Sequence, residues 1–337
     1  MNVERISLSE WDRMLPSAGF EVFHTPEALS VLETHTDGEL HLLGATKGEQ
    51  PLALMPAFLR QNGIGTAVFS PPPGMGVPRL GPILMPTSPK RRKREKLNRE
   101  FTDGALDELG GNGSRTLFRM ECNAAYDDPR PFLWADFDVS NAFTYCLGID
   151  GNVEEIRSSF SKSLRREVRD AEDLPIEIAI EGIEGARAVY EDTRARYDEQ
   201  DEPFPIEWAY VRDLVSALGD RVRVYVARDS NGEFLSGITV LYSNEMAYFW
   251  QGGARADYEG TSVNSAVHWR IIEDIATDPD LASITRYDLM GANTERLCRY
   301  KAKFSADLVP YYVVESNGAV MTIAKTAYTL GRNYLPS

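Results

Sequence analysis

Two lysines lie close to the end of a predicted strand in the last third of the chain. The segment SITRYDLMGAN (283–293) reads as a strand that enters a turn, and Lys301 and Lys303 follow it within RYKAKFSAD. Only eight of the 337 residues are lysines, and these two are flanked by Tyr300 and Phe304. A cation positioned near the end of a strand can stabilise the oxyanion that develops during acyl transfer, by about 3 kcal/mol for one well-placed donor. The alternative is that both lysines lie on a solvated turn.

Two further residues could take part in proton transfer. Asp288, in the same predicted strand, could accept the proton that an attacking amine loses, provided that it approaches to about 3 Å. Its structural alternatives are a pair with Arg286 or a cap on the turn. His268 lies beside Trp269 on a helix predicted over 263–276. For His268 we expect a helix histidine with satisfied hydrogen bonds, in preference to a catalytic base.

Other chemistries lack their usual residues. Cys122, Cys146 and Cys298 are far apart, form no CxxC motif and do not cluster with the four histidines. We therefore expect neither a disulfide nor a metal site. No Walker loop and no Ser-His-Asp signature is present.

Two glycine-rich segments could bind an anion through backbone N–H groups. RQNGIGTA (60–67) fits the RxxGxG/A pattern that holds the CoA pyrophosphate, but a strand and a proline loop follow it where that role requires a helix N-terminus. A hairpin turn is the favoured interpretation. WQGGARADYEGTS (250–262) precedes a helix and could bind an anion with Arg255, although it lacks the pattern.

Two predicted helices carry clusters of basic residues. The helix over 88–109, with Ser88 as N-cap, begins with PKRRKREK, which places cations where the helix dipole disfavours them. The helix over 160–174 places Arg165 and Arg166, with other basic residues, opposite its apolar face. Either cluster could bind tRNA, a nucleotide-linked acceptor or an anionic lipid surface. The alternative is that both are solvated faces, and no nucleic-acid-binding signature motif is present.

The order of elements repeats about 180 residues apart along the chain. Segments 23–69 and 204–250 each read as a helix, a strand, a tight turn and two further strands. The pattern predicts two homologous α/β lobes, which we assign to residues 1–150 and 151–337.

Several motifs resemble those of the FemAB-like proteins, a branch of the GNAT superfamily. In that family the second lobe has a helix with basic residues before an Ala-Glu pair, a helix with an Asn ahead of a Trp, and a strand Tyr-Asp-hydrophobic-Gly-Gly followed by Phe-Lys-x-x-Phe-Gly. The corresponding segments here, with the one that resembles the first-lobe helix, are LRREVRDAED (164–173), NSAVHW (264–269), YDLMG (287–291), YKAKFS (300–305) and FHTPEALSVLE (23–33). They keep the family's order over nearly the whole chain.

The resemblance implies an α/β protein of two tandem GNAT-like lobes, the acyl-CoA N-acyltransferase fold. Lys301 matches the motif's lysine and is the expected catalytic cation, with Asp288 as the second catalytic candidate. Tyr300 and Phe304 match the aromatics expected to line the cleft. The full set of expected substrate-binding residues is Tyr300, Phe304, Trp250, Arg255, Asn264, Arg165, Arg166 and Tyr287.

The sequence departs from the family pattern at three places. Met290 and Ser305 stand where the motifs have glycine, and 182–204 leaves no room for the long helical arm of some members. These differences bear on the acceptor and on the use of charged tRNA more than on the fold.

The expected function is transfer of an acyl or aminoacyl group to an amine in the second lobe. No bound cofactor is expected, and the donor is aminoacyl-tRNA or acyl-CoA. The acceptor is a small-molecule or a glycan- or lipid-linked amine. One alternative is an acyl-CoA-dependent N-acyltransferase, and another is a non-catalytic module that binds an anionic glycan or lipid precursor.

The charge balance favours an acidic surface and a salty solvent. Asp and Glu outnumber Lys and Arg by 51 to 36, for a formal net charge of −15. A lysine-poor acidic surface suits molar salt, which screens self-repulsion, so we expect a halophilic protein. The chain has neither a recognisable signal peptide nor an apolar stretch that would span a membrane, which favours a cytoplasmic location. The oligomeric state stays open.

Overall fold

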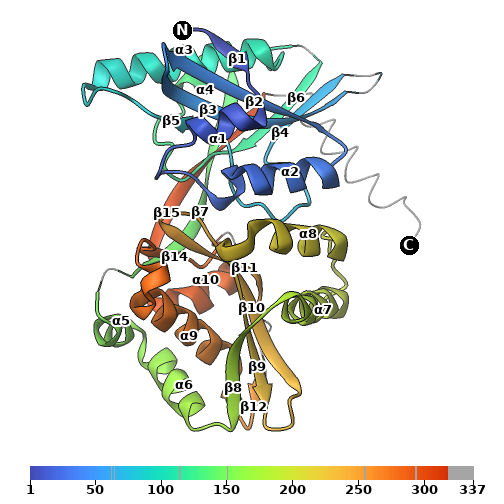
Figure 1. Ribbon diagram of the computed structural model, residues 1–337, viewed down its shortest axis with the longest axis vertical. Coiled ribbons are helices and arrows are strands. Elements are labelled where there is room, and N and C mark those ends of the chain that lie inside the picture. Colours follow the sequence, from blue (N-terminus) through green and yellow to red (C-terminus); the bar gives the residue numbers. More distant parts are fainter. Residues whose placement is uncertain are drawn as a thin grey trace. The chain divides into compact units, whose positions relative to one another are not determined.

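The chain is described by a computed structural model that covers residues 1–61, 63, 65–113, 115–149, 151–253, 256–292 and 294–317 (Figure 1). It divides into two compact units. Unit 1 comprises Met1–Pro73, Val77–Ala142 and the chain from Pro310 onwards, and unit 2 comprises Gly74–Gly76 and Phe143–Val309. The helix expected from Met321 lies outside the described residues.

The sheet of unit 1 has one parallel pair among antiparallel neighbours. Its strands, in spatial order, are β1 (Val3–Arg5), β2 (Glu39–Lys47), β3 (Gln50–Gln61), β4 (Thr66–Ser70), β6 (Thr116–Glu121) and β15 (Asp307–Ser316), with the short β5 (Ile83–Leu84) on β3. Among the described strands of unit 1, β4 and β6 are the parallel pair, and they stay paired from Thr66↔Thr116 to Ser70↔Met120. The antiparallel pair Gln61↔Thr66 confirms that the chain around 60–67 forms a hairpin.

The helices of unit 1 are α1 (Leu8–Met14), α2 (Pro26–His35), α3 (Arg91–Glu108) and α4 (Arg130–Trp134), with a 3₁₀ turn at Val22–His24. Thr25 caps α2 by accepting a hydrogen bond from the Ala28 N–H. The predicted start of the helix over 88–109 was wrong, because α3 begins at Arg91 and its N-cap is Lys90. Ser88 Oγ accepts a bond from the Lys90 N–H at 3.4 Å, a local turn that competes with helix formation.

The sheet of unit 2 repeats the order of unit 1. Its strands are β8 (Ile176–Glu181), β9 (Val222–Asp229), β10 (Phe234–Tyr242), β11 (Met246–Gly252), β14 (Arg286–Asp288) and the end of β7 (Phe137–Gly148). Again one pair of the described strands, β11 with β14, is parallel. A small hairpin, β12 (Asp257–Tyr258) and β13 (Thr261–Ser262), follows β11. The two α/β lobes predicted from the repeat are thereby confirmed.

Helices cover both faces of the sheet of unit 2 (Figure 1). They are α5 (Val153–Ser159), α6 (Lys162–Glu172), α7 (Ile183–Glu199), α8 (Trp208–Leu218), α9 (Val263–Thr277) and α10 (Glu295–Lys301), with 3₁₀ turns at Gly219–Arg221, Pro279–Leu281 and Ala302–Phe304. Leu164 of α6 and Val267 of α9 share an apolar core with Ile238 of β10. On the other face, Val189 of α7 packs with Val226 of β9. Among the described residues, none of the helices has the length and apolar character needed to cross a membrane.

Candidate functional site

In unit 2 the two parallel strands separate soon after they meet. β11 pairs with β14 only from Met246↔Arg286 to Tyr248↔Asp288. Beyond Asp288 the backbone turns away through two residues of positive φ, Met290 at 49° and Gly291 at 61°. We call the diverging segments, 249–252 and 289–292, the fork. The equivalent strands of unit 1, β4 and β6, keep five consecutive pairs. Among the described residues, the early divergence of the two parallel strands is therefore specific to unit 2.

A β-bulge lies on the β11 side of the fork. Thr239 of β10 pairs with Gln251 while the next residue, Val240, pairs with Phe249, so Trp250 is the extra residue. Bulges bend a strand and redirect its side chains, and they are frequent beside active sites.

Lys301, the last residue of α10, extends its side chain to the fork. Its Nζ donates a hydrogen bond to the Gly291 carbonyl at 3.0 Å and lies 5.8 Å from the centre of the Phe249 ring. The residue is only 5% exposed. Burial lowers the pKa of its ammonium to about 8, and the negative charge of Asp288 opposes that decrease. Gly291 O is the one hydrogen-bond acceptor that Nζ has among the described residues, which leaves N–H groups available to a ligand.

Asp288 is held by two donors next to that lysine. The carboxylate accepts hydrogen bonds from the Thr144 hydroxyl and from the Met290 N–H, the latter at 2.7 Å, and the residue is fully buried. The bond to Met290 caps the turn, which is one of the structural roles predicted for Asp288. Its charge also favours the ammonium form of Lys301.

His268 lies in an aromatic cluster beside Lys301. Its Nδ1 is 3.0 Å from the Tyr287 hydroxyl, and its ring packs edge-on against Phe249 and Phe304 at centroid distances of 4.8 and 5.2 Å. Burial and the Lys301 charge lower the pKa of the imidazole to about 3, so His268 is neutral. Its Nε2 has no hydrogen-bond partner among the described residues. The expectation of a fully satisfied helix histidine was wrong on this point.

Asn264 connects the start of α9 to α10. Its Nδ2 donates to the Tyr300 hydroxyl at 2.8 Å, while its Oδ1 finds no partner within the part of the chain that the structure describes. Burial raises the pKa of Tyr300, which therefore stays a neutral phenol. Next to this pair, Glu167 accepts hydrogen bonds from Ser265 Oγ and from Lys303 Nζ, each at 2.8 Å. Lys303 thus forms an ion pair on the α6 side and does not contact the fork.

The structure gathers some of the predicted site residues and separates others. Lys301, Asp288, Tyr287, Tyr300 and Asn264 lie around the fork, and Phe304 packs into the core beneath it.

The remaining predicted residues do not reach Lys301. Trp250 Nε1 donates to the Gly76 carbonyl at 3.0 Å, and its ring packs against Tyr210. Arg165 and Arg166 are exposed on α6, where Arg165 bonds to the Ser158 carbonyl and Arg166 pairs with Asp170. Arg255 lies outside the described residues.

Sequence reasoning missed Gln251, which lies in the fork and is 5% exposed. A polar residue inside an otherwise apolar strand, AYFWQG, was the only available signal.

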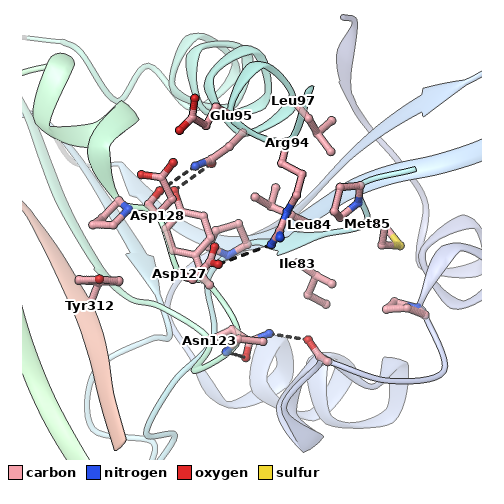
Figure 2. A pocket seen from close by; sticks show the side chains of 18 of the residues that line it. Ile83, Leu84, Met85, Arg94, Glu95, Leu97, Asn123, Asp127, Asp128 and Tyr312 are labelled. Carbon is pink, nitrogen blue, oxygen red and sulfur yellow. Dashed lines mark hydrogen bonds and ion pairs between the residues drawn. The ribbon is translucent and has the colours of Figure 1, made fainter. Parts of the chain in front are cut away.

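A separate cavity of about 710 Å³ lies within unit 1 (Figure 2). Figure 2 shows Arg94 of α3 pointing toward Asp127, to which it pairs at 3.5 Å. Arg130 bonds to both Asp128 and Glu95 at 2.7 Å. Arg94 of α3 and Arg130 of α4 therefore face carboxylates of their own unit, which reduces the excess positive charge that the basic cluster at the start of α3 predicted.

Comparison with known proteins gives a family match within unit 2. Residues 158–302 match the family described as "Acetyltransferase (GNAT) domain", a range that includes Lys301 and the fork. No curated protein matched.

Solved structures share the fold of nearly the whole chain. FemX superposes with a TM-score of 0.68 at 11% identity and covers 93% of this chain and 97% of its own. The C-terminal domain of a putative lysylphosphatidylglycerol synthetase from Agrobacterium fabrum gives a TM-score of 0.57 at 12% identity, with 96% of each chain covered. L-PGS from Bacillus licheniformis gives 0.54 at 12% identity, with 96% of each chain covered. At these identities the similarity establishes the fold.

Proposed function

We propose that this chain, a FemXAB-like member of the GNAT acyltransferase superfamily, transfers an acyl or aminoacyl group from an activated ester or thioester to an amine at the fork of unit 2. The observation that carries the proposal is the buried Lys301 ammonium, which has a single protein acceptor within the described residues. Its remaining N–H groups can donate to the substrate carbonyl oxygen.

The reaction needs stabilisation of negative charge on that oxygen. The acceptor amine attacks the carbonyl carbon, the C–O or C–S bond to the leaving group breaks, and the proton lost by the amine is balanced by the proton gained by the leaving group. Lys301 donates hydrogen bonds to the oxyanion of the tetrahedral intermediate, an interaction that is stronger in the transition state than with the neutral ester. Phe249 and Phe304 keep water away from the charge, which strengthens the interaction.

The acceptor amine must arrive neutral. His268 is a weak base because the pKa of its imidazole is lowered to about 3, and Asp288 already accepts two hydrogen bonds. With a pKa of about 8, the Lys301 ammonium is acidic enough to pass a proton to an alkoxide leaving group. Asp288 acts as a positioning residue that keeps the lysine charged.

An aminoacyl donor is our preferred assignment, with acyl-CoA as the second candidate. The name of one similar structure refers to a putative lysylphosphatidylglycerol synthetase, and an aminoacyl ester leaves as an alkoxide that needs a proton. The acyl-CoA candidate is favoured by the match to an acetyltransferase domain.

The purified protein is to be incubated with labelled aminoacyl-tRNA or with acetyl-CoA in the presence of a panel of small amines, peptides and aminolipids. We expect mass spectrometry to find an amine that gains the mass of the acyl or aminoacyl group. If the protein binds a donor or an amine but neither donor class yields an amide, it is a binding module and the proposed transfer is contradicted.

A further inference from the structure

The start of α3 concentrates positive charge in an acidic protein. The stretch 90–99 includes seven basic side chains and one acid, whereas the formal net charge of the whole chain is −15. Arg91 and Arg94 line the cavity of unit 1, and each pairs with a carboxylate of that unit. The cavity side of the helix is therefore largely neutralised, and the excess charge lies on its other side.

The solvent side of α3 has few carboxylate partners. At 100° per residue the buried Asn98 and Ala105 mark the inner side of the helix. The exposed cations on the outer side, which we call the basic face, are Arg92, Lys93, Lys96 and Arg99. Lys96 and Arg99 make loose surface pairs with Glu100 and Asp103, at 3.5 and 3.7 Å, and such pairs contribute little. Arg92 and Lys93 have no ion-pair partner within the described part of the chain.

An apolar tip borders the basic face. It consists of Leu133 and Trp134, at the end of α4, which are 49% and 59% exposed. The guanidinium carbons of Arg99 and Arg130 each lie 5.7 Å from the centre of the Trp134 ring, and Arg130 also pairs with Glu95 of α3 at 2.7 Å. Single exposed apolar residues are ordinary, but here two consecutive ones are held beside a row of cations.

We propose that the basic face and the apolar tip together form a contact surface for an anionic phospholipid bilayer. Such a bilayer presents phosphates to the cations and hydrocarbon to the apolar side chains at one boundary, where tryptophan is enriched. A nucleic acid would supply phosphates, and bases on which the indole could stack, but no apolar surroundings for Leu133. The inference concerns unit 1 alone and does not depend on the transfer proposed for unit 2.

The negative charge of the rest of the protein does not prevent this contact. At physiological ionic strength the Debye length is about 8 Å, so the charges nearest the bilayer decide the attraction. Each Lys or Arg close to an anionic surface strengthens binding about fivefold, and the apolar tip adds burial at the acyl boundary.

Sedimentation of the intact protein with vesicles tests the proposal. The vesicles are phosphatidylcholine alone, or phosphatidylcholine mixed with phosphatidylglycerol. We expect the wild type to bind the mixed vesicles more tightly, by about 10-fold or more. Arg92→Gln/Lys93→Gln should weaken that binding about 25-fold, and Leu133→Gln/Trp134→Gln about 10-fold or more. All four side chains are exposed, so the fold should be retained.

Two matched pairs on unit 2 serve as controls. Lys162→Gln/Arg166→Gln removes the same charge from the exposed side of α6, and Ile180→Gln/Leu308→Gln removes two apolar side chains that are 48% and 52% exposed. Both should bind the mixed vesicles like the wild type. The proposal is overturned if the wild type binds neither vesicle, or if the controls lose as much affinity as the α3 and α4 variants.

Tryptophan fluorescence provides a second readout. Trp11, Trp250 and Trp269 are buried and Trp208 is partly buried, so an emission shift to shorter wavelength on adding mixed vesicles should come from Trp134 and be absent in Trp134→Phe. Binding without that shift would show that the indole stays in water and would contradict the proposal. Binding of tRNA that Arg92→Gln/Lys93→Gln abolishes, without binding of vesicles, would identify a nucleic-acid surface and overturn it.

Discussion

At the scale of single residues, the function proposed for this protein depends on a positive charge that is buried away from water. Lys301 loses most of its hydration, and burial lowers the pKa of its ammonium from 10.5 to about 8. At pH 7 the side chain is still mostly protonated, and above pH 8 it progressively loses its charge. This titration gives Lys301 two measurable consequences.

The first consequence concerns the pH dependence of transfer. If the ammonium stabilises the oxyanion, the wild-type kcat/KM, expressed per neutral acceptor amine, should fall about tenfold per pH unit above pH 8. Lys301→Arg keeps its charge at these pH values and should give a flat profile at a lower overall rate. Rates measured from pH 6 to 10 check this, and identical profiles for the two proteins would rule out the titration of Lys301 as the cause.

The second consequence concerns stability. Because the folded-state pKa is below the unfolded value, the unfolded chain binds more protons between pH 8 and 10.5, and the free energy of unfolding rises with pH in that window. Below pH 8 the full cost of burying the charge is present. Lys301→Met should therefore be more stable than the wild type by about 3 kcal/mol at pH 7, with the difference fading toward pH 10.5. Urea unfolding at both pH values measures it, and a less stable variant at pH 7 would contradict the cause given for the pKa decrease.

Sequence reasoning could find Lys301 but not the atoms that lack partners. Lys301 follows a recognisable strand and lies between two aromatics, a pattern that left a solvated turn open, and the resemblance to the FemAB-like motifs singled it out. Gln251 and the Nε2 of His268 stand out only because nothing near them completes their hydrogen bonds. That property depends on tertiary packing, which no local pattern encodes.

At the scale of elements, two turns adopt the left-handed backbone that suits glycine, one after β14 and one after the 3₁₀ turn Ala302–Phe304. Met290 and Ser305 stand at these turns in place of the motif glycines, yet both keep a left-handed backbone, with φ of 49° and 55°. A side chain in this conformation costs about 1–2 kcal/mol. Ser305 offsets part of the cost because its hydroxyl donates to the Ser159 carbonyl, whereas Met290 makes no comparable side-chain hydrogen bond.

Met290→Gly should therefore stabilise the protein by about 1 kcal/mol, after allowance for the greater freedom of glycine in the unfolded chain. Met290→Ala retains a Cβ and the strain, so it serves as the control and should not be stabilised. Urea denaturation of both variants gives the comparison. Equal stabilities for the glycine and alanine variants would show that the turn carries no strain.

The elements themselves followed from the sequence where local signals were strong. Thr25 and Pro26 marked the start of α2, and the apolar face of α6 was read from its periodicity. The strand predicted over 283–293 shortened to three residues, because Asp288 accepts the Met290 N–H and bends the chain at once. The sequence pattern that predicted the strand continues past Asp288, so it did not indicate that the strand ends there.

At the scale of the whole molecule, two units with the same strand order differ in one functional respect. Among the described residues, the parallel strands of unit 2 diverge after three pairs, whereas those of unit 1 stay paired over five. In the same part of the chain, unit 2 alone has a buried lysine where the strands diverge. The repeat in the sequence predicted both lobes, whereas the fork depends on a single short turn and could not be predicted.

The acidic surface gives a prediction for the molecule as a whole. With a formal net charge of −15, the folded protein repels itself, and salt screens that repulsion because the Debye length falls to about 3 Å at 1 M. We propose halophilic adaptation and expect the melting temperature to rise substantially from 0.1 to 2 M KCl. A melting temperature that is flat or falls over this range would refute it.

Turnover by Lys301→Met decides whether this lysine catalyses transfer. Loss of the ammonium should lower kcat on the order of 100-fold or more with little change in substrate affinity, because the charge acts on the transition state. Lys303→Met is the matched control. It removes a neighbouring lysine that pairs with Glu167 and should retain near-normal turnover. Near-normal kcat for Lys301→Met, with the same donor and acceptor as the wild type, would contradict the catalytic role of Lys301.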